Sequence, residues 1–484
     1  MTQGSSIGSV AFLLLLLGGC TGVGGSLPFQ ALSSVVKPSE QAGSTVEPVQ
    51  GPTSAGPHAI TAQMQPAAYT GSAKAVHGAQ RFGIVELIDV AMESNPTLRV
   101  RGNRILSAQT QVKSAKLQFL ATPSVSVEGP VTQNDPLLRG NDAVTILRVQ
   151  QPLWTGGRLT SNLRRAKATV DVAEADLDHE RQGVALGILD KYNQWYSSYL
   201  KRQAMIEGQS LYAHLESLIQ RRIDAGASAE SDMLVLQSRV DQLNVSINQM
   251  ETSEQTAIAA LSQYIGGPLM AADLKQESAG PQISSTDAQR LVEQARARSP
   301  LLRRLSAEVR VADEGISRAR STLSPEIYLR AQRQYGRLDY KTDEPIDSVY
   351  VGVQSQLGAG LSNLVDIQGA AYDRDTAKLS IRSGELALVE QMTTDLAVAS
   401  TIDARIRNLE SAVRSTGETR ESWDRQFVAG RKTWLDVMNA AREQMDLKVQ
   451  LADARATAIV VRWRLRILAD GLDSHIPSMK GERN

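Results

Sequence analysis

Apolar residues recur at alternating intervals of three and four positions over two long stretches of the chain. The first stretch contains Met233, Leu236, Val240, Leu243, Ile247 and Met250. The second contains Leu447, Leu451, Ala454, Ala458, Val461, Leu465 and Leu468. A repeat of about 3.5 residues is typical of the seam of a coiled coil rather than of one face of an ordinary globular helix. The pattern therefore predicts long paired helices.

The spacing of the prolines indicates how long these helices are. No proline occurs between Leu153 and Gly267, or between Ile346 and Ile476. Because proline ends most helices, both stretches can be helical over most of their length. We expect the helix at 160–224 to have about 65 residues and a length of about 100 Å, too long for a compact domain.

A second pattern, strict alternation of apolar and polar residues, occurs in short segments of both halves. Val349, Val351 and Val353 alternate with polar residues or glycine, and Ile327, Leu329 and Ala331 do the same. The first half contains a shorter alternation around Val125 and Val127 and a less regular one over 143–152. Alternation predicts strands with one apolar and one polar face. Two strands are therefore expected in each half.

The same features recur 204 positions apart, which predicts an internal tandem repeat. Asn95-Pro96 corresponds to Ser299-Pro300, and each pair interrupts a helical pattern. Gly226 corresponds to Gly430, and Asp232 to Asp436. Each repeat should contain a broken helix, two strands, a very long helix, a turn and a returning helix. Four strands cannot close a membrane barrel alone, so several chains would have to contribute to one.

Composition excludes several classes of protein. Lys plus Arg and Asp plus Glu are equal at 52 each, whereas nucleic-acid-binding surfaces are basic. Five scattered histidines and a single cysteine give no metal-ligand spacing and no catalytic pairing. We expect neither an enzyme nor a cofactor nor a metal site.

The N-terminal region has the features of an export signal followed by a tether. An apolar run precedes Cys20, and Leu17-Gly18-Gly19-Cys20 resembles a bacterial lipobox, in which the cysteine is lipidated. The alternatives are an ordinary cleaved signal and a wrongly assigned start of the chain. Few charges and many small residues between 21 and 80 cannot form a core, which predicts a disordered tether.

These boundaries divide the chain into five predicted parts. A signal peptide at 1–19 precedes a lipidated, disordered tether at 20–80. The first repeat is expected at 81–280, the second at 281–473, and a C-terminal tail at 474–484.

The order of these pieces resembles the TolC-like family of outer membrane factors. The matching segments are the Asn-Pro and Ser-Pro breaks, "QQPLWTGGRL" (150–159), "VAGRKTWLDVMNA" (428–440) and "LADARATAIVVRWRL" (451–465). The resemblance covers about 82–473 and implies a mainly α-helical homotrimer with a small β part. A twelve-stranded outer-membrane barrel, four strands from each chain, would continue as a coiled-coil tunnel through the periplasm.

The resemblance also assigns roles to residues at the two turns between long helices, which form the periplasmic entrance in this family. Gly226 and Gly430 would be turn glycines, Arg431 and Lys432 basic residues of the closed entrance, and Asp232 and Asp436 its acids. Asn439 stands where the family has a second ring of acids, and Phe427 where it often has tyrosine. The plainer alternatives are acids favoured at helix N-termini and a solvated turn. Trp434 could contact an adaptor, or pack between the tip helices.

The function implied is a passive exit duct that docks onto a periplasmic adaptor and an inner-membrane transporter. The sequences of the second turn (428–440) and of the last helix (451–465) resemble more closely those of members that serve type I protein secretion. Efflux of drugs or metals is the alternative cargo. A periplasmic coiled-coil scaffold or adaptor is a further alternative, although it would need no alternating strands at matched places in both halves.

Overall fold

The computed structural model describes residues 81–128, 144–277, 280–281, 288–336, 346–355 and 358–472. These residues belong to one compact unit, Gly71–Asn484. The predicted signal peptide, the whole of the predicted tether with Cys20, and the predicted tail lie outside the described residues.

The described elements follow one another in the same order in both halves. The first half contains α1 (Ile84–Ser94), α2 (Pro96–Leu117), β1 (Thr122–Glu128), β2 (Val144–Trp154), α3 (Arg158–Asp224), α4 (Glu230–Ile265) and the short η1 (Ala271–Asp273). The second contains α5 (Ala288–Arg298), α6 (Pro300–Ser321), β3 (Glu326–Tyr335), β4 (Ile346–Gln354), the short η3 (Ala359–Leu361), α7 (Ser362–Val428) and α8 (Trp434–Asp470). The predicted fold class, mainly helical with a small antiparallel sheet, is confirmed at this level. Among these helices, none combines the length and the apolar character needed to cross a membrane.

The break between the first two helices of each half is made by a capped proline start. The Asn95 side chain accepts a hydrogen bond from Thr97 N at 2.9 Å, and the Ser299 side chain accepts one from Leu302 N at 3.3 Å. Proline follows each cap at the first helical position, where its missing N–H costs nothing. The matched Asn-Pro and Ser-Pro dipeptides therefore start α2 and α6 in the same way.

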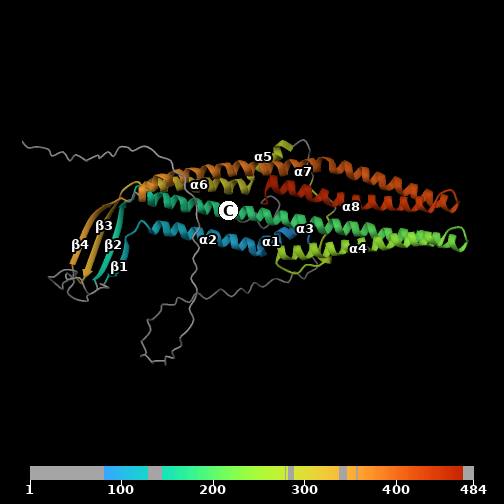
Figure 1. Ribbon diagram of the computed structural model, residues 1–484, viewed down its shortest axis with the longest axis horizontal. Coiled ribbons are helices and arrows are strands. Elements are labelled where there is room, and N and C mark those ends of the chain that lie inside the picture. The colour runs from blue at the N-terminus through green and yellow to red at the C-terminus, as the bar shows by residue number, and fades with distance from the viewer. Residues whose placement is uncertain are drawn as a thin grey trace, which may run out of the picture. The chain divides into compact units, whose positions relative to one another are not determined.

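The four strands form one antiparallel sheet in the order β1-β2-β3-β4. The two halves meet between β2 and β3, where Arg148 lies opposite Gln332 and Gln150 opposite Arg330. Strands β1 and β4 are the outer strands, so each has one edge without a strand partner among the described residues. Figure 1 shows the strands together at one end of the long helices and the α3–α4 and α7–α8 turns at the other.

Helix α3 is the central element of the helical part. It is 67 residues long and packs against α2, α4, α6 and α8 (Figure 1). Its aromatic residues Tyr192, Trp195 and Tyr196 are buried in the largest core cluster. The predicted seams are also confirmed, because Leu236 and Leu243 of α4 and the apolar positions of α8 from Leu451 onward face other helices.

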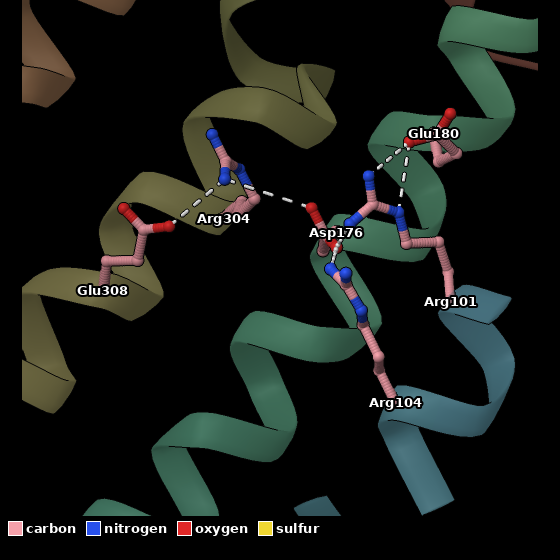
Figure 2. A network of polar contacts seen from close by, with 6 residues as sticks. All are labelled: Arg101, Arg104, Asp176, Glu180, Arg304 and Glu308. Carbon is pink, nitrogen blue, oxygen red and sulfur yellow. Dashed lines mark hydrogen bonds and ion pairs between the residues drawn. The ribbon is translucent and has the colours of Figure 1, made fainter. Parts of the chain in front are cut away.

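Between the sheet and this core, α2, α3 and α6 are joined by charges rather than by a wide apolar layer. Arg101 of α2 reaches Asp176 of α3 at 2.9 Å and Glu180 at 2.8 Å (Figure 2). Arg304 of α6 lies 3.9 Å from the other oxygen of Asp176, so one carboxylate is shared between two neighbouring helices. The network fixes the three helices side by side where few large apolar residues are available.

Candidate functional site at the hairpin turns

The two turns between long helices have the same backbone. In the first, Gly226 N donates to Ile223 O at 2.8 Å and Ala227 N to Arg222 O at 2.7 Å. In the second, Gly430 N donates to Phe427 O at 3.0 Å and Arg431 N to Gln426 O at 2.8 Å. This pair of bonds is the Schellman motif, which satisfies the last carbonyls of a helix.

The motif requires a left-handed residue, and glycine supplies it in both turns. Gly226 has φ 67° and Gly430 has φ 72°. A Cβ atom at either position would meet nothing within 4 Å, so only the backbone conformation selects glycine here. Gly226 and Gly430 therefore lie in the turns between the long helices, as the sequence predicted.

The returning helices begin differently. Thr433 caps α8: its hydroxyl accepts from Asp436 N at 3.2 Å, and the Asp436 carboxylate accepts from Thr433 N at 3.1 Å. The Thr433 hydrogen bonds lower the pKa of Asp436, with a further contribution from the nearby Lys432 charge. Helix α4 has Ala229 at the corresponding position and no side-chain cap. Asp436 is thus a capping residue as well as a candidate entrance acid.

An aromatic pair of the second hairpin, Phe427 and Trp434, packs against the first hairpin. Phe427 and Trp434 are 4% and 6% exposed, and their ring centroids lie 5.3 Å apart. The Trp434 indole N–H donates to the backbone oxygen of Asp232 at 3.0 Å. Within a single chain, both aromatic side chains pack between the hairpins. The structure therefore places Phe427 and Trp434 in a core cluster shared by the two hairpins.

Arg222, which the sequence did not single out, links the same two segments. Its Nη1 donates to Phe427 O at 2.7 Å, and its guanidinium lies 4.6 Å from the centre of the Phe427 ring. Its Nε donates to Ser228 Oγ at 3.2 Å. A basic residue in the last turn of a helix is a known partner for free carbonyls. That signal was present at Arg222, but the partner helix lies about two hundred residues away in sequence.

The remaining predicted residues are closer to solvent. Lys432 Nζ lies 4.2 Å from the centre of the Trp423 ring, whereas Arg431 and Asn439 are exposed. Asp232 lies in the first turn of α4. Within the described part of the chain, the two basic residues and the two acids of the predicted entrance form no ion pair with one another.

A family comparison places these turns in a wider context. The family model described as outer membrane efflux protein matches residues 87–267 and 291–468, which include both turns. The chain belongs to the outer membrane efflux protein family. Membership confirms the resemblance drawn from the sequence, and it means that the chain is an outer membrane efflux-family protein and not an enzyme.

The individual relatives of this efflux-family chain have low sequence identity to it. Protein CyaE of Bordetella pertussis is 24% identical over 290 residues, which are 58% of this chain and 59% of CyaE. The alkaline protease secretion protein AprF of Pseudomonas aeruginosa is 23% identical over 343 residues, 68% of this chain and 70% of AprF. The match to CyaE thus spans less than two thirds of that relative.

Solved structures show the same fold. The Campylobacter jejuni CmeC outer membrane channel superposes with a TM-score of 0.65 at 16% identity, covering 80% of this chain and 85% of CmeC. At this identity the likeness establishes the efflux-family fold alone.

Proposed function

We propose that three copies of this chain form an exit duct across the outer membrane, extended into the periplasm by the paired helices. The main support for this proposal is the exposed apolar face of the sheet and its outer edges, which are unpaired among the described residues. The β4 residues Val349, Val351 and Val353 are 72%, 71% and 68% exposed, on a face that suits lipid. The outer edges of β1 and β4 need partners, because unpaired backbone groups cost several kcal/mol each in hydrocarbon. Three copies would supply twelve strands and a water-filled lumen.

Fractionation tests this assembly. The full chain should enter the outer-membrane fraction as a trimer that migrates differently on gels before and after heating. The purified protein should conduct ions in planar bilayers. Release of a monomer by osmotic shock would contradict the duct and favour the alternative of a periplasmic scaffold or adaptor.

We infer that the cargo is protein, passed on by an inner-membrane ABC transporter through a periplasmic adaptor that contacts the tip turns near Gly226, Gly430 and Trp434. The name of AprF, an alkaline protease secretion protein, supports this cargo. The family description as efflux protein supports the alternative, export of drugs or metals by a proton-driven pump. Deletion of the gene should remove specific proteins from the culture medium. Unchanged secreted protein combined with new drug or metal sensitivity would favour the alternative.

We propose that charges at the turns narrow the entrance when three chains assemble. Asp436→Asn removes the charge but keeps an acceptor for Thr433 N, and Lys432→Gln removes the opposite charge. Each variant should raise single-channel conductance, because it removes one charge from the ion pairs that narrow the entrance. An exposed ion pair contributes only about 0–1 kcal/mol, so the loss of one charge is enough to favour the open entrance. The control is Asp446→Asn, an exposed acid further along α8. Equal conductance in all variants would reduce the entrance residues, including Asp232, Arg431, Phe427 and Asn439, to structural parts of the turns.

We also propose that Cys20 is lipidated and anchors the chain to the membrane. The lipobox-like sequence before it supports this modification. Radiolabelled palmitate should enter the wild-type protein and not Cys20→Ser. Incorporation in neither protein would favour an ordinary cleaved signal.

A further inference from the structure

The polar face of the sheet carries arginine without acid partners. Residues directly opposite one another on paired strands share a face, so the register defines rows of side chains across the sheet. One row consists of Ser124, Arg148, Gln332 and Ser348. The next row consists of Thr122, Gln150, Arg330 and Tyr350. Each row thus contains one guanidinium and no carboxylate.

The two arginines are held by neutral groups only. Arg330 Nε donates to Gln150 Oε1 at 3.2 Å, and its guanidinium lies 4.7 Å from the centre of the Tyr328 ring. Arg148 Nε is shielded from solvent and has no hydrogen-bond partner. No ion pair of either arginine occurs in the described ranges. Because arginine stays charged in proteins, two positive charges lie at diagonal positions without an acid partner among the residues that the structure describes.

The acids on the same face are neutralised or distant. Glu326, at the helical end of the sheet, accepts from Arg158 at 3.0 Å. Glu128, at the other end, lies four residues beyond Ser124, or about 13 Å along the strand. That separation exceeds the screening length of about 8 Å at physiological ionic strength. The middle of the polar face is therefore a positive surface.

The opposite face shows that this arrangement is not general in the sheet. Arg333 there has an acid directly across from it, and its Nε lies 3.7 Å from Asp347. A hollow of about 500 Å³ adjoins the polar face, and its lining includes Arg148, Gln150 and Asn162. Glu326 also lines it, together with Arg158, with which it is paired. An anion beside Arg148 in this hollow would meet a guanidinium that has no ion-pair partner among the described residues, together with side-chain amides; these are the donors that carboxylates and phosphates require.

From this geometry we infer that the polar face is an anion-binding surface, with Arg148 and Arg330 as its ligands, for carboxylate or phosphate groups that pass the sheet. In the duct proposed above, on which its transport role rests, three chains would place six such arginines around the lumen at the sheet end. Rings of arginine favour anions in pores. The sheet end of the duct would thus select for anionic solutes and retain acidic stretches of a polypeptide.

Calorimetric titration of the full-length protein in detergent tests the binding surface without requiring conduction. Tripolyphosphate represents free phosphate, and poly-L-glutamate represents carboxylates on a polypeptide. Arg148→Gln and Arg330→Gln should each weaken binding about tenfold, because each removes charge-assisted hydrogen bonds. Arg333→Gln, which removes the same charge from the opposite face, should leave binding unchanged. The variants must share the wild-type circular dichroism spectrum.

The outcomes separate the inference from the proposed duct. Binding supports the anion-binding surface if it depends on Arg148 and Arg330. The probe that binds, whether tripolyphosphate alone or both probes, identifies the source of the anions. Absence of binding, or equal weakening by Arg333→Gln, overturns it. In bilayers, the wild type should pass chloride more readily than potassium, and the Arg148→Gln/Arg330→Gln variant should lose that preference. Arginine-dependent binding by a protein that never conducts would retain the surface and reject the duct.

Discussion

The α3–α4 and α7–α8 hairpins have nearly the same dimensions but different contacts. Helices α3 and α7 each have 67 residues, and both turns use a left-handed glycine. Yet α8 begins with a side-chain cap and a buried tryptophan, whereas the matched positions of α4 are Ala229 and Glu230. The comparison teaches that the turn is repeated as backbone geometry, while the side chains that connect the two turns come from positions that are not equivalent in the two repeats.

The contact is asymmetric in a second way. Arg222 of the first hairpin donates to the end of α7, and its counterpart in the second repeat is Gln426. Trp434 of the second hairpin donates to the start of α4. Each hairpin thus contributes one donor to the other, from positions that are not equivalent.

Trp434→Ala should have the largest effect on this contact. Truncating a buried tryptophan typically costs about 3–5 kcal/mol, and here it also removes the hydrogen bond from the indole to the Asp232 carbonyl. Hydrogen exchange at the amides of both turns should accelerate. Glu230→Ala, at the matched exposed position, is the control and should change exchange little. Similar effects of the two variants would mean that the turns are held together elsewhere.

Arg222→Ala should have the next largest effect, about 2 kcal/mol, because hydrogen bonds from a charged donor to the Phe427 carbonyl are lost. Exchange should accelerate at the end of α7 as well as at the first turn. Gln426→Ala is the matched control and should be nearly neutral. An effect confined to the first turn would show that Arg222 does not connect the hairpins.

The glycine variants test the shared part of the comparison. Gly226→Ala and Gly430→Ala should each destabilise their turn by about 1 kcal/mol, since each forces a side chain into the left-handed region without any clash. Protease sensitivity at the two turns should rise equally. A much larger effect at one glycine would contradict the equivalence of the two backbones.

The cap can be transferred between hairpins. Ala229→Thr would place a threonine three residues before Asp232, as Thr433 stands before Asp436, and should stabilise α4 by about 0.5–1 kcal/mol. Thr433→Ala should destabilise α8 by a similar amount. Thermal unfolding of the full chain, followed with exchange at the first helical turns, measures both. No gain from Ala229→Thr would mean that α4 begins in a geometry that excludes the cap.

The smallest expected effect is the pH dependence of the α8 cap. Because the folded pKa of Asp436 is lowered, its contribution is present above the unfolded pKa and is lost as pH falls through the folded pKa. Thr433→Ala should raise the pKa of Asp436 toward its usual range. Carboxyl NMR titration of both proteins gives the answer, and an unchanged pKa would remove Thr433 as its cause.

Much of this arrangement was determined by local sequence. The 3-4 spacing predicted the long helices because a coiled-coil seam requires that period, and alternation around Val351 predicted strands because side chains alternate across a sheet. Gly226 and Gly430 predicted the turns, since few other residues adopt positive φ at low cost. The offset of 204 positions predicted that each element would occur twice.

Only the tertiary structure decided which side chains meet. Arg222 and Phe427 are far apart in sequence, so their contact depends on how two hairpins pack and has no local signal. The pairing of β2 with β3 likewise sets Arg148 beside Gln332 instead of an acid, because register is a property of two strands and not of either alone. The sequence by itself determined the helices, the strands and the turns. Packing between the repeats determined the contacts and the charge of the surfaces on which the proposed functions depend.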